Sequence, residues 1–109
     1  MFERKEGEDK QMYNVEFASK RVKKELSKFN QKEKLMIEEA IRVLAEDPRP
    51  ASLQYGSVNK NRNVKRVKCK RARLFYMIND EDKVVYIGKI ENRDSKSYAT
   101  DPKEWFAAV

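Results

Sequence analysis

The chain has 109 residues, a formal net charge of +7 and 39% charged residues, which fits one domain with a modest core. Eleven aromatic residues (one Trp, five Tyr and five Phe) argue against a disordered chain. Histidine is absent, Cys69 is the single cysteine and there are three glycines, which argues against His-dependent catalysis, an internal disulfide, a zinc site and a glycine-rich phosphate loop.

The N-terminal third predicts a tail, a strand and a helix. Residues 1–11 are nearly all charged and lack periodicity, so we expect a flexible tail before a single domain at residues 12–109. Apolar residues alternate with polar ones over residues 13–17, which predicts a short half-buried strand. Apolar residues then recur at helical spacing over about residues 19–29, which predicts a basic amphipathic helix.

A second helix begins after Asn30, because Glu33 three residues later completes a capping-box pattern. Asp47 and Pro48 end this helix. Its predicted core stripe consists of Ile37, Ala40, Ile41 and Leu44.

The second half of the chain predicts three strands, at residues 64–70, 73–78 and 83–90, with a polar hairpin turn at residues 79–82. Residues 101–106 resemble a short terminal turn of helix. Trp105 and Phe106 would cap the core, bind a partner or lie over a functional face, and we favour the cap. The fold class is therefore α+β: one strand and two antiparallel helices packed on an antiparallel sheet that the three C-terminal strands complete.

Charge is concentrated in residues 48–78, which hold nine basic side chains and no aspartate or glutamate. Residues 1–50 carry twelve basic and eleven acidic groups (+1), whereas residues 51–109 carry thirteen and seven (+6). Lysines also protect sheet edges, but nine cations without one acid exceed that need, so we expect a face that binds a polyanion. The nine are Arg49, Lys60, Arg62, Lys65, Arg66, Lys68, Lys70, Arg71 and Arg73.

The order of these elements resembles the RelE/ParE toxin superfamily of toxin-antitoxin systems. Three patterns carry the resemblance: an L-x-x-D-P helix end at residues 44–48, Arg73 opening an aromatic-rich strand, and Arg93 followed five residues later by Tyr98. The likeness covers roughly residues 12–98. RelE-like members are ribosome-dependent messenger RNA endonucleases, whereas ParE-like members share the fold but act on DNA gyrase and lack the nuclease residues.

The resemblance implies a catalytic set made of Lys68, Arg73, Arg93 and Tyr98. Arg66 would assist Lys68 on the same strand, and the other RNA-binding candidates are Lys60, Arg62, Lys65, Lys70 and Arg71.

Strand alternation bears on which strand cation faces the RNA. It places Arg66, Lys68 and Lys70 opposite Val67 and Cys69, but Lys65 or Lys70 could take the place of Arg66 and Lys68. For Arg73 the alternative is an ordinary ion pair with Asp80, Asp82 or Glu91. Cys69 reads as a small buried apolar residue.

RNA can be cleaved without a metal or histidine when its 2′-hydroxyl attacks the adjacent phosphorus. The resemblance makes Lys68 the base, since neighbouring cations favour the neutral form of a lysine. Arg73 would clamp the phosphate with its planar fork. Arg93 would stabilise charge or protonate the leaving group, and Tyr98 would stack on a base. The products would be a 2′,3′-cyclic phosphate and a 5′-hydroxyl.

The expected partners are messenger RNA in the ribosomal A site, ribosomal RNA and a cognate antitoxin. No cofactor or metal is expected. With neither a secretory signal nor an apolar run of the roughly 20 residues that a transmembrane helix needs, we expect a cytoplasmic location away from membranes. Two alternatives are a ParE-like gyrase inhibitor without nuclease activity and a non-catalytic basic nucleic-acid-binding module.

Overall fold

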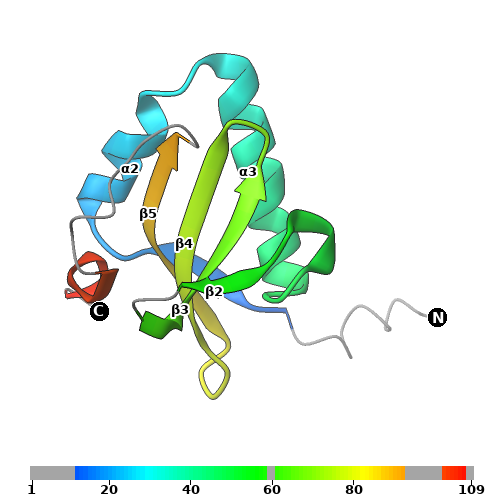
Figure 1. The fold of residues 1–109 in the computed structure, drawn as a ribbon, viewed down its shortest axis with the longest axis vertical. Helices are drawn as coiled ribbons and strands as arrows, with labels where there is room; N and C mark the ends of the chain where they lie inside the picture. Colours follow the sequence, from blue (N-terminus) through cyan, green and yellow to red (C-terminus); the bar gives the residue numbers. More distant parts are fainter. Residues whose placement is uncertain (1–11, 59–60, 93–101, 108–109) are drawn as a thin grey trace.

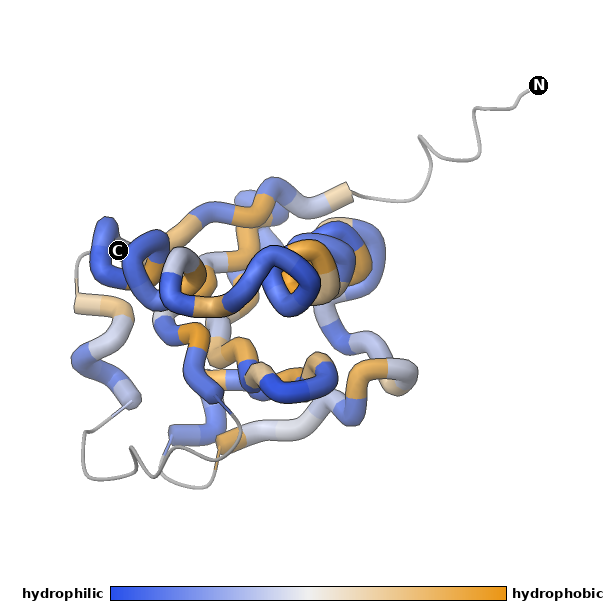
Figure 2. Tube along the Cα trace, turned by 90° about the horizontal axis from the view of Figure 1, so that it is seen from above, coloured by the Kyte–Doolittle hydropathy of each residue, from blue (hydrophilic) through white to orange (hydrophobic). Residues whose placement is uncertain are grey.

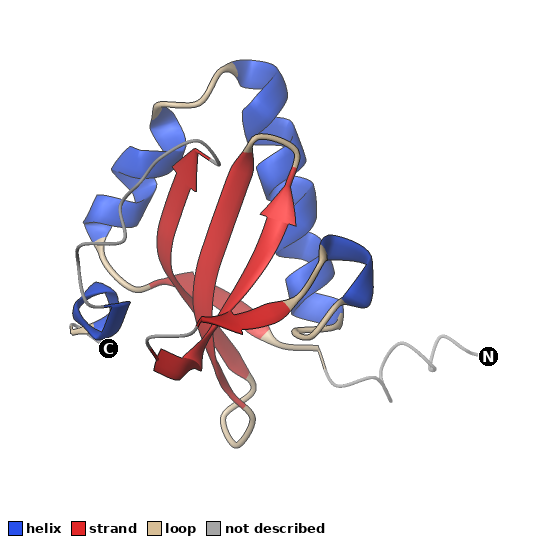
Figure 3. Ribbon diagram, viewed as in Figure 1, coloured by secondary structure: helices blue, strands red, loops and turns tan. Residues whose placement is uncertain are grey.

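The computed structural model describes residues 12–58, 61–92 and 102–107. Two helices cover one face of a five-stranded sheet, so the α+β prediction is confirmed (Figures 1 and 3). In chain order the elements are β1 (Asn14–Phe17), α2 (Lys20–Ser27), α3 (Gln31–Glu46), the 3-10 turn η1 (Ala51–Leu53), β2 (Gly56–Val58), β3 (Asn61–Cys69), β4 (Ala72–Asn79), β5 (Val84–Asn92) and the 3-10 turn η2 (Pro102–Phe106).

The sheet is mixed rather than wholly antiparallel. Its strand order is β1-β5-β4-β3-β2, and β1 pairs in parallel with β5, while the other neighbouring pairs are antiparallel. Alternation along β1 indicates a strand but carries no information on its direction, because no hairpin joins β1 to β5. The three-residue β2 was not predicted, since so short a segment shows no periodicity.

The described strands also differ from the prediction at their ends. β3 begins three residues earlier than expected and ends at Cys69, so that Lys70 lies in the β3–β4 turn with a positive φ of 50°. The prediction that Lys70 belongs to the strand is therefore wrong. The predicted tail at residues 1–11 lies outside the described residues.

The main core lies between the helices and the sheet, where both layers carry apolar residues (Figure 2). From the helices it contains Val22, Ile37, Ala40 and Leu44, as the periodicity predicts, and Ile41 packs against its border. Tyr76 is fully buried among these side chains, and its hydroxyl donates a 2.6 Å hydrogen bond to the Pro48 carbonyl. That bond holds the end of α3 against β4.

A smaller apolar cluster lies on the opposite face of the sheet. Trp105 and Phe106 of η2 are buried there, and the Trp105 ring centroid is 5.0 Å from that of Phe75. The Phe106 ring lies directly over Gly88: a Cβ at that position would be 2.5 Å from two ring atoms. The terminal aromatic pair is therefore packed against the sheet, but on the face away from the main core and not as a cap on that core.

Side chains of α2 form hydrogen bonds with backbone groups in the part of β5 that lies beyond the end of β1. β1 pairs with residues 84–87 of β5. Beyond these residues, the Nη2 atom of Arg21 donates to the Gly88 carbonyl (2.7 Å), and the Ile90 N–H donates to Glu25 Oε1 (2.9 Å). These two side chains supply hydrogen bonds that a neighbouring strand would otherwise provide.

The capping box at the start of α3 is present as the sequence predicts: the Glu33 N–H donates to Asn30 Oδ1 (2.8 Å) and the Asn30 N–H to Glu33 Oε1 (3.2 Å). Because Asn30→Ala removes an acceptor from the first turn, we expect it to lower the free energy of unfolding by about 1 kcal/mol, measured by urea denaturation. Ser19 at the start of α2 makes no side-chain capping bond, so Ser19→Ala should change stability by less than about 0.5 kcal/mol. Equal losses in the two variants would contradict the assigned role of Asn30.

Candidate functional site

Three charged residues form a row across β3, β4 and β5. Lys68 is paired in register with Arg73, and Arg73 is paired with Glu91. Their strand neighbours Val67, Leu74 and Ile90 belong to the helix-side core. Since side chains alternate along a strand, the row Lys68–Arg73–Glu91 points to the face away from the helices.

The adjacent row on this face contains Arg66, Phe75 and Lys89, again paired in register across the three strands. Val67 and Cys69 both pack on the helix side. The predicted alternation, with Arg66 and Lys68 opposite Val67 and Cys69, is therefore confirmed.

Arg73 is held in a largely enclosed position. Its side chain is 17% exposed, and its Nη1 atom lies 3.8 Å from Oε2 of Glu91, whose side chain is 5% exposed. Of the three carboxylates considered from the sequence, Glu91 is the one that forms this pair. Asp80 instead contacts Arg49 at 2.9 Å, and Asp82 accepts from the Asn79 side-chain amide at 3.2 Å.

Arg66 reaches toward the short edge strand β2. A Cβ on Gly56, its register partner, would lie 3.1 Å from Arg66 Nη2, so the glycine leaves room for the guanidinium. The Arg66 Nε atom is buried and has no hydrogen-bond partner among the described residues. Register places Arg66 on the same face as Lys68 and Arg73, with its Nε atom enclosed.

Lys65 does not occupy the same face as Lys68. It is paired with Tyr76, which lies in the helix-side core, and its Nζ atom contacts the Arg62 carbonyl (2.7 Å) and Ser57 Oγ (3.1 Å). Register thus disfavours Lys65 as a substitute for Lys68.

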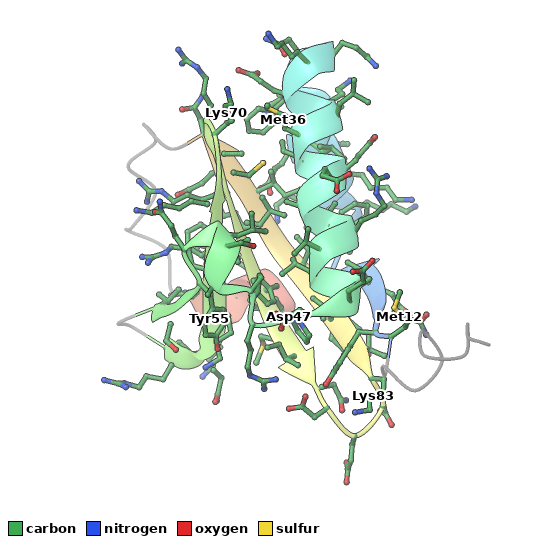
Figure 4. All side chains as sticks on the ribbon, turned by 90° about the vertical axis from the view of Figure 1, so that its right-hand side faces the viewer. Met12, Met36, Asp47, Tyr55, Lys70 and Lys83 are labelled. Atoms are coloured by element: carbon green, nitrogen blue, oxygen red, sulfur yellow. The ribbon has the colours of Figure 1, made fainter. Side chains whose placement is uncertain are left out.

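The β3–β4 turn adds exposed positive charge at one end of the sheet. Lys70 lies there near Met36 of α3, while Lys83 lies toward the opposite end of the molecule (Figure 4). Arg71 is exposed, with its Nε atom 4.0 Å from Glu33 Oε2. The predicted RNA-contact role of these residues and of Arg62 remains a prediction, and Lys60, Arg93 and Tyr98 lie outside the described residues.

A polar cavity of about 340 Å³ adjoins the row where β5 meets the α2–α3 connection. Glu25 organises one wall, because its Oε2 atom accepts from Arg21 Nη1 (2.7 Å) and from Lys89 Nζ (3.0 Å). Sequence reasoning did not single out Glu25 or Lys89, which are 64 residues apart in the chain. The residues lining the cavity are Glu25, Lys28, Phe29, Glu33, Lys89, Ile90, Glu91 and Asn92.

Cys69 contributes little thiol reactivity. Burial raises the pKa of its thiol, and its Sγ atom donates to the Met36 carbonyl at 3.2 Å. A raised pKa reduces the thiolate fraction at neutral pH. These features agree with a small apolar packing residue.

Arg49, the first cation of the acid-free stretch, is engaged at the opposite end of the sheet. Its hydrogen bond to Asp80, together with one from the Tyr13 hydroxyl, lowers the pKa of Asp80 to about 2. We expect Arg49→Gln to raise that pKa, as measured by NMR titration of the Asp80 carboxyl carbon.

Because the folded-state pKa lies below the ordinary value, the stabilisation from this pair is present above about pH 4 and is lost as the pH falls toward 2. An Asp80 titration that Arg49→Gln leaves unchanged would contradict the assigned cause.

Within the described ranges, no group of three or more His, Cys, Asp and Glu residues is placed to hold a metal ion. In the same ranges, each helix is too short or too polar to span a membrane.

The fold is that of RelE toxins, as comparison with solved structures shows. No protein-family model and no curated protein sequence matches the chain. The archaeal RelE in the RelE–RelB complex from Pyrococcus horikoshii OT3 is 23% identical, with a TM-score of 0.68 over 78% of this chain and 99% of that chain.

Two further structures show the same likeness. A chain of the Mycobacterium tuberculosis RelBE2 toxin–antitoxin complex is 20% identical, with a TM-score of 0.66 over 77% of this chain and 94% of its own. A doubly substituted E. coli RelE toxin in the free state is 18% identical, with a TM-score of 0.67 over 85% of this chain and 96% of its own. At these identities the likeness establishes the fold.

Proposed function

We propose that the protein is the toxin of a toxin-antitoxin system and acts as a ribosome-dependent messenger RNA endonuclease. It cleaves by attack of the RNA 2′-hydroxyl on the adjacent phosphate and needs no metal. The observation that carries the proposal is the pairing of Lys68 with Arg73 on the face away from the helices, with Arg66 in the next row, on a fold shared with RelE toxins.

In this proposal Arg73 binds the scissile phosphate and stabilises the charge that develops on it. Lys68 lies directly across the strand pair, where Cβ atoms are typically about 5 Å apart, so its amine can reach a 2′-hydroxyl next to that phosphate. Arg66 adds charge from the neighbouring row. Arg93 and Tyr98 keep the roles that the family resemblance implies, as charge stabiliser or leaving-group acid and as base-stacking residue.

The proposed partners follow from the charge and from the matched structures. Messenger RNA in the ribosomal A site and ribosomal RNA would contact the exposed cations of the β3–β4 turn, which attract polyanions in a salt-dependent manner. Two of the matched structures are complexes with RelB or a RelB-type antitoxin, which supports a cognate antitoxin as the restraining partner. The proposed site of action is the cytoplasm.

The direct test adds purified protein to ribosomes programmed with a defined messenger RNA. Cleavage that requires the ribosome, with products ending in a 2′,3′-cyclic phosphate, is the expected result. Intact messenger RNA together with blocked gyrase supercoiling would favour the ParE-like alternative. Salt-sensitive RNA binding without cleavage at any concentration would favour the non-catalytic binding module.

A further inference from the structure

Glu91 is the one charged residue that is buried among the described parts of the chain, with 6% of its surface exposed. Burying a carboxylate carries a large desolvation cost. A buried ion pair often stabilises a protein no better than packed apolar residues of the same volume. Folding stability alone therefore does not explain a glutamate at this position of β5.

The charges around Glu91 indicate what it does. Glu25 already accepts hydrogen bonds from Arg21 and Lys89, and Glu33 belongs to the capping box. Glu91 is the carboxylate of this cavity that is paired with Arg73.

Arg73 has opposite charges on its two sides. Lys68 on β3 and Glu91 on β5 are both paired with it in register. Like charges directly opposite on neighbouring strands repel. The Lys68 charge therefore pushes the guanidinium away from β3, and the Glu91 carboxylate attracts it toward β5.

We infer that Glu91 is a positioning residue that fixes the guanidinium of Arg73 before RNA arrives. This inference rests on the proposed function, in which Arg73 binds the scissile phosphate. An arginine side chain is flexible, so a fixed fork loses less conformational entropy when it binds phosphate. The Glu91 carboxylate lies 3.8 Å from Nη1 on one side of the fork, while 17% of the side chain stays exposed for contact with a phosphate.

The main experiment is a double-mutant cycle on single-turnover cleavage with saturating programmed ribosomes. Glu91→Gln keeps the shape of the side chain and removes its charge. We expect it to reduce the cleavage rate ~10- to 100-fold, as misplacement of a catalytic group does. The ribosome concentration at half-saturation should change less than about twofold, since charge steering by the exposed cations is kept. Glu91→Asp, which keeps the charge, should restore part of the rate.

The coupling between the two residues distinguishes positioning from a general structural role. If Glu91 acts through Arg73, Glu91→Gln should cause no further loss in an Arg73→Ala background. The same fractional loss in both backgrounds, or no loss in the single variant, would overturn the inference.

A second measurement does not depend on cleavage. The Nε–H group of Arg73 should give an ordered NMR signal in the parent protein and in Glu91→Asp, and an averaged one in Glu91→Gln. Equal order in all three would refute positioning. Intact messenger RNA with the parent protein would instead refute the proposed function, and the NMR result would still decide whether Glu91 fixes Arg73.

Asp80→Asn provides the matched control. It breaks the Arg49–Asp80 ion pair, which also joins two parts of the chain but lies at the β4–β5 hairpin, away from Arg73. We expect its cleavage rate to remain within about twofold of the parent, because exposed ion pairs affect little beyond their surroundings. Thermal unfolding of every variant confirms that the compared proteins are folded at the assay temperature.

Discussion

Replacing Arg73 with alanine should reduce ribosome-dependent messenger RNA cleavage ~100- to 1000-fold, because removing a preorganised donor to a transition-state charge typically costs that much. Arg73 lies between Lys68 and Glu91 in the row, and 17% of its side chain is exposed, which suits contact with one phosphate. The rate should be measured in single turnover, with thermal unfolding recorded in parallel.

Arg73→Lys should retain part of the activity, because an ammonium supplies the charge but not the two-pronged contact of a guanidinium. Arg49→Ala is the matched control within the same acid-free stretch, since Arg49 is paired with Asp80 at the opposite end of the sheet. Its cleavage rate should stay close to that of the parent. Full cleavage activity in a folded Arg73→Ala protein would show that Arg73 does not bind the scissile phosphate.

Replacing Gly88 with alanine should lower the free energy of unfolding by about 1–3 kcal/mol, which is the usual cost of forcing an extra group into a packed cluster. The new Cβ would lie 2.5 Å from two atoms of the Phe106 ring, so the ring has to move. Because Phe106 packs with Trp105 and Phe75 in the smaller cluster, its movement disturbs the attachment of η2 to the sheet. Urea denaturation measures the loss.

Repeating the substitution in a Phe106→Ala background tests whether contact with the Phe106 ring causes the loss of stability. With the ring removed, Gly88→Ala should cost less than about 0.5 kcal/mol. The three atoms nearest to the new Cβ all belong to the Phe106 ring. A loss as large as in the parent background would mean that strain within β5 causes the effect, and not the contact with Phe106.

The helices were predictable from the sequence because their signals are local. The apolar spacing that includes Val22, Ile37 and Leu44, and the pairing of Asn30 with Glu33, are complete within a few turns of the chain. The parallel pairing of β1 with β5 depends on contacts between residues about 70 positions apart, such as Asn14 with Val84. No local pattern encodes such a pairing.

In the candidate site too, local features were predictable from the sequence and pairings between strands were not. Alternation correctly placed Arg66 and Lys68 on one face, because side-chain direction along a strand is a local property. It could not choose Glu91 over Asp80 as the partner of Arg73, since that choice depends on the register between β4 and β5. Alternation along β3 also gave no indication that Gly56, on the neighbouring strand β2, leaves space for the Arg66 side chain.

The hydrogen bonds from α2 to the end of β5 have a consequence for association with other chains. Arg21 and Glu25 occupy the Gly88 carbonyl and the Ile90 N–H, which an incoming extended peptide would need for strand addition. This end of β5 is therefore closed to β-augmentation as long as α2 stays in place. A partner that extends the sheet through backbone pairing would therefore add beside one of the two edge strands, β1 or β2, or would first have to displace α2.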